Sequence, residues 1–321
     1  MKRVSIMKIL SRLVGLAAIA AVLIPLQARA ADKLTVLLDW FVNPDHAPLV
    51  IAAEGGYFER HGLDVELIAP ADPSAPPRLV AAGQADIAIT YQPDLMLLIN
   101  EDLPLVRFAT LIETPLNALI VLKDGPVKTL ADLKGKKVGF SIAGIQDAYL
   151  DGILKSVGLT TDDVEMVNVN FNLVSALLSG QVDAAIDGYR NFELTQLEIE
   201  GKPGIAFYPE EHGVPIYDEL IFVAKSDRRD DPLLGRFVAA IEEATVFLTN
   251  HPDEAREMFL ASHPDLNDEL NRRAFDLTLP RFAKRPAALD AGRYQRFAEF
   301  LAAQGLIDGI PPVDDYAVVP R

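Results

Sequence analysis

Four side chains suited to binding a small molecule occur within eight residues near the start of the chain. Trp40, the only tryptophan, offers a flat aromatic face, and Asp39 offers a carboxylate beside it. Asn43 and His46 add an amide and an imidazole. Stacking on such a ring contributes about 0.5–1.5 kcal/mol beyond burial of area, and a carboxylate makes charge-assisted hydrogen bonds to amines. The set suits a flat, amine-bearing ring, but a packed, capped loop with His46 bonded to a carbonyl would have the same composition.

A second group of aromatic, amide and acid residues follows a buried strand much later in the chain. Tyr189 could stack on a ring, and Glu193 could accept from an exocyclic amine or share a proton with a ring nitrogen. These two residues would share a face if the segment were helical, because they are four apart. Asn191 could orient a ligand or bond the backbone. Glu193 could equally be a solvated acid on a helix face.

Weaker candidates follow other strands. Tyr91 could be a second stacking plate or a tyrosine of the core, and Glu113 is an acid just beyond an apolar run. Ser141 and Gly144 border a turn of small residues whose backbone N–H groups could bind an anionic or carbonyl group at a helix start. This turn lacks the glycines of a phosphate-binding loop, so it does not indicate nucleotide hydrolysis.

The sequence lacks the motifs of several enzyme classes. It contains no cysteine, which excludes disulfides, thiolate metal sites and a cysteine nucleophile. Its five histidines are scattered and form no H-E-x-x-H pattern, and no G-x-S-x-G elbow is present. Composition alone does not exclude a Ser-His-Asp hydrolase, but no motif indicates one, and we expect no catalytic residues, metal or cofactor.

The first thirty residues have the composition of a secretory signal peptide. Basic residues come first, at Lys2, Arg3, Lys8 and Arg12. An apolar run over 14–26, too short to cross a bilayer comfortably, leads to the small-x-small sequence Ala28-Arg29-Ala30. We expect cleavage after Ala30 and, without a cysteine to carry lipid, a periplasmic protein that is not lipid-anchored.

Removal of residues 1–30 would take away five positive charges and no acid, so the net charge would go from −16 to about −21. Such a charge argues against nucleic acid or an anionic membrane as a partner. We expect a monomer, and a mature chain of this length suits two domains.

Apolar strands alternate with helices over the first two thirds of the chain, which predicts an α/β fold with mainly parallel sheets flanked by helices. The strand predicted at 119–122 leaves the first unit, a second unit occupies 123–220, and a strand at 221–224 returns. We therefore predict lobe I from residues 31–122 and 221–321 and lobe II from residues 123–220. The two crossings, near Leu122 and Leu220, would form a two-strand hinge.

Several segments resemble the type II periplasmic solute-binding proteins. The resemblance rests on GGYFERHGLDV at 55–65, GQADIA at 83–88 and LADLKGKKVG at 130–139. The opening LDW with Asn43 and His46 is similar to a motif of the thiamine-pyrimidine family, which includes ThiY-like binding proteins and the fungal thiamine-pyrimidine synthase. GYRNFE at 188–193 is similar to that family's G-x-aromatic-N-x-E element, with Arg190 at the aromatic position.

The resemblance implies a two-lobed type II fold and the substrate-binding subunit of an ABC importer. It implies an aminopyrimidine ligand, formylaminopyrimidine or hydroxymethylpyrimidine, and the transmembrane permease subunits as partners. The fungal synthase holds pyridoxal phosphate on a lysine where this chain reads Thr90-Tyr91-Gln92, and its cysteine motif has no counterpart. A binder of riboflavin, a sulfonate or nitrate, or an exported pyrimidine-processing enzyme, remain alternatives.

Overall fold

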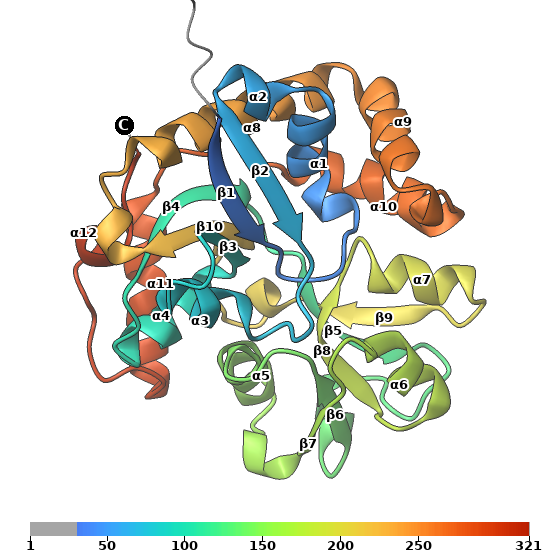
Figure 1. Cartoon of the computed structure of the whole chain (residues 1–321). Helices are drawn as coiled ribbons and strands as arrows, with labels where there is room; N and C mark the ends of the chain where they lie inside the picture. Colours follow the sequence, from blue (N-terminus) through green and yellow to red (C-terminus); the bar gives the residue numbers. More distant parts are fainter. Residues whose placement is uncertain (1–30, 321) are drawn as a thin grey trace, which may run out of the picture. The chain divides into compact units, whose positions relative to one another are not determined.

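The computed structural model describes residues 31–320, so the expected signal peptide lies outside the described residues. Within this range ten strands form two five-stranded sheets (Figure 1). The first has the order β2-β1-β3-β10-β4 and contains β1 (Asp32–Leu37), β2 (Leu63–Ile68), β3 (Ile87–Thr90), β4 (Leu105–Ile112) and β10 (Leu220–Lys225). The second has the order β7-β6-β8-β5-β9 and contains β5 (Asn117–Leu122), β6 (Lys137–Phe140), β7 (Glu165–Asn168), β8 (Ala184–Tyr189) and β9 (Gly204–Phe207).

Four of the five strands in each sheet run in one direction. In the first sheet β1 pairs parallel with β2 and β3, whereas β10 is antiparallel to β3 and β4. In the second sheet β6 pairs parallel with β7 and β8, whereas β5 is antiparallel to β8 and β9. Each reversed strand is the first one after the chain crosses between sheets. The predicted α/β class is confirmed, and both sheets are mixed because each contains this one reversed strand.

Helices flank both sheets: α1 (Ala47–Glu54), α2 (Tyr57–Arg60), α3 (Pro76–Ala81), α4 (Gln92–Asn100), α5 (Ile145–Lys155), α6 (Leu173–Ser179), α7 (Glu193–Ile199), α8 (Pro232–Asn250), α9 (Pro252–Ser262), α10 (Glu269–Thr278), α11 (Ala291–Gln304) and α12 (Val313–Tyr316). The apolar pattern of 49–59 predicts one helix, but Gly56 has φ 69° and separates α1 from α2. Only glycine adopts this conformation readily, so the helix ends there. None of the described helices has the length and apolar character needed to span a membrane.

The first crossing between the sheets comes earlier in the chain than predicted. The strand expected at 119–122 to end the first unit is β5, which pairs with β8 and β9 of the second sheet. The chain therefore crosses at 113–116, before β5, and returns over 208–219, between β9 and β10. Strand β9 was not predicted. Its four residues are all half-buried, so they lack the alternation of buried and exposed residues that marks a strand at a sheet surface.

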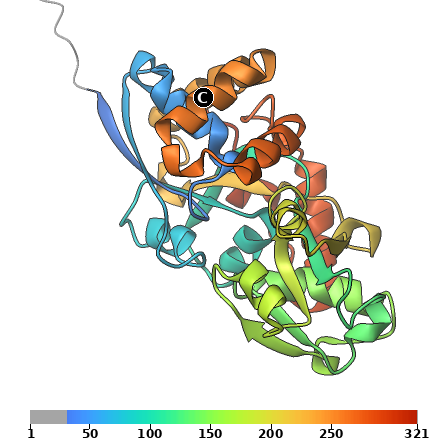
Figure 2. The same cartoon turned by 90° about the vertical axis from the view of Figure 1, so that its right-hand side faces the viewer.

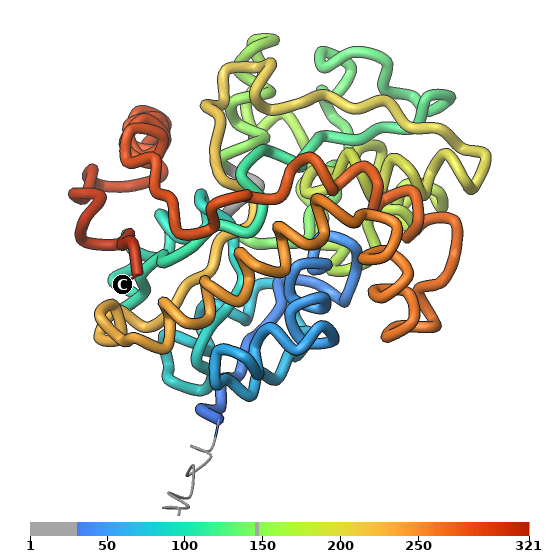
Figure 3. Tube along the Cα trace, turned by 90° about the horizontal axis from the view of Figure 1, so that it is seen from above, coloured from blue at the N-terminus to red at the C-terminus, as the bar shows by residue number. Residues whose placement is uncertain are grey.

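The C-terminal helices cover the first sheet and also contact the second. Helix α8 packs against α1 and α2 (Figure 3). Phe237 of α8 stacks on Phe58 of α2 with 5.4 Å between ring centroids. Helix α9 packs against α1 (Figure 2). Helix α10 contacts both the short 3₁₀ helix η2 (Pro44–His46), which follows β1, and α7 of the second sheet. This helix therefore joins elements of the two sheets.

Candidate ligand-binding site

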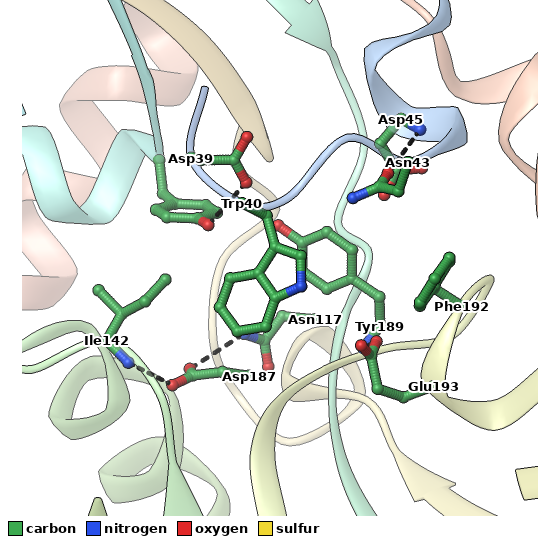
Figure 4. A pocket seen from close by; sticks show the side chains of 11 residues that line it. Asp39, Trp40, Asn43, Asp45, Asn117, Ile142, Asp187, Tyr189, Phe192 and Glu193 are labelled. Atoms are coloured by element: carbon green, nitrogen blue, oxygen red, sulfur yellow. Dashed lines mark hydrogen bonds between the residues drawn. The ribbon is translucent and has the colours of Figure 1, made fainter. Parts of the chain in front are cut away.

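A cavity lies where strands of both sheets end (Figure 4). Its walls come from the segments that follow β1, β3, β6 and β8 and from the start of β5. Open α/β sheets bind ligands at this position, beyond the carboxyl ends of their strands. The walls are formed by Asp39, Trp40, Asn43, Asp45, Tyr91, Asn117, Ile142, Asp187, Tyr189, Phe192 and Glu193.

The turn after β1 is fixed by hydrogen bonds within itself. The Asn43 side chain accepts from the backbone N–H of Asp45 at 2.8 Å, and the Nδ1 atom of His46 accepts from the Asn43 N–H at 3.3 Å. Together these bonds form a capping box at the start of η2. The Asn43 side chain also donates to the carbonyl oxygen of Phe41 at 3.1 Å. These bonds hold the side chains of Asn43 and His46 against the backbone of the turn.

Both carboxylate oxygens of Asp39 are bonded by neighbouring side chains. Because Nδ1 of His46 accepts from the Asn43 N–H, Nε2 is the ring nitrogen that donates, and it bonds Asp39 Oδ1 at 2.9 Å. The Tyr91 hydroxyl donates to Asp39 Oδ2 at 2.8 Å. Burial, followed by the charge of Asp39, raises the pKa of Tyr91 well above its ordinary value, so this phenol stays protonated as the donor.

His46 is therefore not on the cavity wall, where it was predicted. It is fully buried behind Asp39 and orients that carboxylate. Tyr91 does line the cavity, and the structure assigns its hydroxyl a definite hydrogen bond to Asp39 besides its aromatic face. The opening turn thus contributes Asp39, Trp40 and Asn43 of its four predicted residues to the wall.

Tyr189 and Glu193 both line the cavity, from either side of the β8–α7 turn. The two residues do not share a helix face, because Tyr189 ends β8 and Glu193 begins α7. Glu193 instead accepts a hydrogen bond from the Tyr189 backbone N–H at 2.7 Å. Burial raises the pKa of Glu193 to about 7, and the neighbouring Asp45 adds to the increase. Glu193 can therefore accept or donate a proton near neutral pH.

Four other predicted residues lie outside the wall. Asn191 is buried and bonds Asp45 and Thr278. The backbone N–H of Ser141 donates to Asp187 Oδ2 at 2.9 Å, so the helix-start amides expected to bind a ligand bind a protein carboxylate. Gly144 caps α5 with φ 97°, and Glu113 is an exposed residue of the first crossing.

Five wall residues were missed in the sequence: Asp45, Asn117, Ile142, Asp187 and Phe192. Asp187 carried a usable signal, because it is an acid next to the buried apolar run of β8. Its φ of 68° and its bonds to the Ser141 and Ile142 amides place the carboxylate at the cavity. Nothing in the local sequence separates Asp45 from an ordinary turn aspartate.

Aromatic rings from both sheets meet at the cavity. Trp40 lies edge to face with Phe171, with 4.5 Å between ring centroids. The ring centroid of Phe41 lies 6.0 Å from that of Phe192 and 6.3 Å from that of Phe171. Trp40 and Phe41 follow β1, whereas Phe171 and Phe192 belong to the second sheet's connections. These contacts provide apolar faces for a ring and bring the two sheets together.

The described wall carries acids and no basic side chain. Its carboxylates are Asp39, Asp45, Asp187 and Glu193. Burial raises the pKa of Asp45 to about 6. Among the described residues no group of His, Cys, Asp and Glu side chains could hold a metal ion. The free space between the walls holds only about two water molecules, so the walls lie close together.

The fold is that of two-lobed solute-binding proteins. The alkanesulfonate-binding protein SsuA from Xanthomonas axonopodis superimposes with a TM-score of 0.73 at 16% identity, over 91% of this chain and 100% of that one. A family model described as NMT1/THI5-like matches residues 43–255. The chain therefore belongs to the NMT1/THI5-like family, which confirms the resemblance to the thiamine-pyrimidine group.

Two relatives share much of the sequence. A protein of Haemophilus influenzae named as a thiamine biosynthesis protein is 49% identical over 94% of this chain and 96% of its own length. The formylaminopyrimidine-binding protein of Halalkalibacterium halodurans is 32% identical over 74% of this chain and 73% of its own length.

Proposed function

We propose that this protein is an exported solute-binding protein of an ABC importer. It binds a thiamine-precursor pyrimidine, formylaminopyrimidine or hydroxymethylpyrimidine, between its lobes and delivers it to the transmembrane permease subunits. It does not catalyse a reaction. Two relatives support this proposal, one named for thiamine biosynthesis and one for binding formylaminopyrimidine.

The wall of carboxylates and aromatic rings is the observation that carries the proposal. An aminopyrimidine presents an exocyclic amine and ring nitrogens in the plane of a flat ring. Asp39, with both oxygens held by the protein, accepts from the amine. Glu193, whose pKa is about 7, shares a proton with a ring nitrogen. Trp40 supplies the apolar face on which the ring stacks.

Binding closes the protein because the contacts come from both lobes. Asp39 and Trp40 follow β1 of the first sheet, whereas Tyr189 and Glu193 flank the β8–α7 turn of the second. A ligand that contacts both lobes makes more contacts in the closed form than in the open form. It therefore stabilises the closed form. Delivery then requires only that the lobes part again at the permease.

The acidic wall weighs against the alternative solutes. A sulfonate or nitrate is an anion and would face four carboxylates, with no cationic side chain among the described wall residues. Riboflavin has a three-ring system, much larger than a single pyrimidine. The enzyme alternative lacks its lysine. The segment Thr90-Tyr91-Gln92 occupies the position of the synthase lysine, and the Tyr91 hydroxyl bonds Asp39.

Thermal unfolding of residues 31–321 with added ligands tests the proposal. The two precursor pyrimidines are expected to raise the midpoint, and thiamine, riboflavin and taurine serve as competing candidates. A clear shift from one of these three, with none from either pyrimidine, would overturn the ligand. Conversion of an aminopyrimidine to a product by the purified protein would establish an enzyme instead.

Replacement of Trp40 tests the stacking contact. Trp40→Ala is expected to weaken pyrimidine binding about tenfold, since the ring loses its stacking face and its buried area. Trp40→Phe keeps an aromatic face and should recover part of the affinity. Both variants should unfold near the wild-type temperature, because Trp40 is only partly buried. Unchanged affinity in Trp40→Ala would mean that the ring stacks elsewhere.

A further inference from the structure

Asp45 joins the two lobes through one of its carboxylate oxygens. It lies in η2 with only 2% of its surface exposed. Its Oδ1 atom accepts from the Asn191 side-chain amide at 2.6 Å and from the Thr278 hydroxyl at 2.8 Å. Asn191 lies between β8 and α7 of the second lobe, and Thr278 ends α10. Three segments distant in sequence therefore meet at a single oxygen atom.

The other oxygen of Asp45 has no hydrogen-bond partner. Oδ2 is buried, and Asp45 forms part of the cavity wall (Figure 4). A buried carboxylate oxygen without a donor is unfavourable, because its interaction with water has been lost and not replaced. A donor that approached through the cavity would restore that hydrogen bond.

The described wall offers no cationic side chain to this oxygen. The other charged wall residues are Asp39, Asp187 and Glu193, all acids. Burial is the main cause that raises the pKa of Glu193, and the charge of Asp45, on the other lobe, raises it further. An N–H group of positive character placed between them would bond Oδ2 and relieve the repulsion. An exocyclic amine on a protonatable ring has this chemistry.

We propose that Oδ2 of Asp45 accepts a hydrogen bond from the ligand's amine. The bond from Asn191 to Oδ1 then links this ligand contact to closure of the lobes. This inference rests on the proposed function and names a specificity-determining residue within that site. Asp39 accepts one hydrogen of the amine and Glu193 holds a ring nitrogen, whereas Asp45 accepts the other amine hydrogen and connects it to the contact between lobes. A ligand without the amine leaves Oδ2 unsatisfied in the closed form and closes the lobes less well.

The competing interpretation is that Asp45 only holds the turn in place. Asp45→Asn separates the two, because the amide keeps an oxygen for Asn191 and Thr278 but places an N–H₂ donor where Oδ2 stood. Thr278→Val is the matched control. It removes the hydroxyl's bond to Oδ1 and the bond that the hydroxyl accepts from Asn191, and it keeps the side-chain shape. Thr278 does not line the cavity.

Calorimetric titration with two ligands tests the proposal: 4-amino-5-hydroxymethyl-2-methylpyrimidine and its 4-oxo counterpart. Wild type should prefer the amino compound, and Asp45→Asn should weaken amino binding about tenfold or more while changing oxo binding much less. Thr278→Val should weaken both compounds by the same factor. Thermal unfolding checks that each variant is folded, and Asp45→Ser repeats the test if the asparagine variant is not.

The outcomes separate the two proposals. If wild type binds the amino compound and the amino-to-oxo preference survives in the Asp45 variant, the role of Asp45 is overturned and the proposed function stands. If Thr278→Val loses the preference as strongly as Asp45→Asn, the effect is structural and the role is likewise overturned. If wild type binds neither pyrimidine, the proposed function fails and this inference fails with it.

Discussion

Two residues, Tyr91 and His46, donate hydrogen bonds to the Asp39 carboxylate, and only one of them lines the cavity. Tyr91 lines the cavity and bonds Oδ2, so it can also touch a ligand. His46 bonds Oδ1 from behind, and its own ring is fixed by the Asn43 N–H. The imidazole therefore acts on a ligand only through the orientation of Asp39. This distinction gives His46 a testable role that its position in the sequence alone did not.

His46→Ala is expected to weaken ligand binding several-fold and to lower the free energy of unfolding by about 1–3 kcal/mol, because Asp39 loses a buried donor. Isothermal titration and denaturant unfolding measure the two effects. His61→Ala is the matched control, since that histidine is bonded to the exposed Glu243 and lies outside the cavity wall. Normal binding in His46→Ala, at unchanged stability, would show that Asp39 keeps its orientation unaided.

The sequence predicted the site residues whose chemistry is concentrated locally and missed those placed by tertiary structure. Asp39 and Trp40 stand out because an acid and the only tryptophan end an apolar strand. Asp187 faces the cavity because its backbone adopts φ 68° at the end of β8, which spacing does not reveal. Asp45 belongs to the site because Asn191 and Thr278 fold against it from segments distant in the chain.

At the scale of elements, hydrophobic periodicity predicted most strands and helices, since burial on a sheet or helix face dictates the pattern. It could not assign β5 to a sheet, because an apolar strand buried on both faces reads the same in either. Pairing with β8 and β9 decides that assignment. The sequence contains two adjacent glycines, Gly55 and Gly56, where the helix breaks. Their pattern does not indicate which of the two ends the helix.

Arg190 occupies the family's aromatic position, and the structure gives it a different task from stacking on a ligand. Its guanidinium donates to the carbonyl oxygens of Leu116 and Asn117 at 3.2 and 3.0 Å, at the first crossing. It also forms two bonds to Glu210 of the second crossing, at 2.7 and 3.1 Å. Arg190 therefore ties together the two crossings between the sheets.

Arg190→Ala is expected to lower the free energy of unfolding by about 1–3 kcal/mol, because two buried carbonyls and a carboxylate lose their donor. Arg190→Lys should recover little, since an ammonium group cannot reproduce the planar fork. Denaturant unfolding measures both. Arg256→Ala, which removes a surface arginine paired with Asp253 and Asp276, provides the comparison. Equal losses in the Arg190 and Arg256 variants would argue against a bracing role at the crossings.

At the scale of the molecule, the raised pKa values of buried carboxyl groups make the stability of the fold depend on pH. Burial raises the pKa of Glu193 and Glu219 to about 7 and that of Asp45 and Asp94 to about 6. Each native group binds its proton more tightly than the unfolded chain does. Its contribution to stability is therefore fully present below the ordinary carboxyl pKa and is lost as pH rises through 6 to 7.

We expect the ligand-free protein to unfold at a higher temperature at pH 5 than at pH 8. The difference should be smaller in Glu193→Gln, which removes one of the titrating groups while keeping an oxygen for the Tyr189 N–H. Thermal unfolding followed by circular dichroism at the two pH values measures it. An unfolding temperature that rises from pH 5 to pH 8 would contradict the shifts assigned to these carboxyl groups.

The narrow cavity implies that a ligand enters only after the lobes part. The free space holds about two water molecules, far less than a substituted pyrimidine. Arg273 of α10 pairs with Glu198 of α7, so the two helices approach each other away from the cavity wall. A covalent link at this position would hold the lobes together without touching a ligand. The chain contains no cysteine, so an introduced pair would be the only one.

Glu198→Cys combined with Arg273→Cys, joined by a short bifunctional maleimide, is therefore expected to slow pyrimidine association by at least about tenfold. Fluorescence of Trp40, the only tryptophan and a wall residue, follows binding in stopped flow. The same double variant left unlinked should associate at the wild-type rate, which separates the link from the substitutions. A link added after the ligand has bound should slow its release in the same proportion. Rapid association with the linked protein would mean that the ligand enters without lobe opening, by movement of wall side chains such as Trp40.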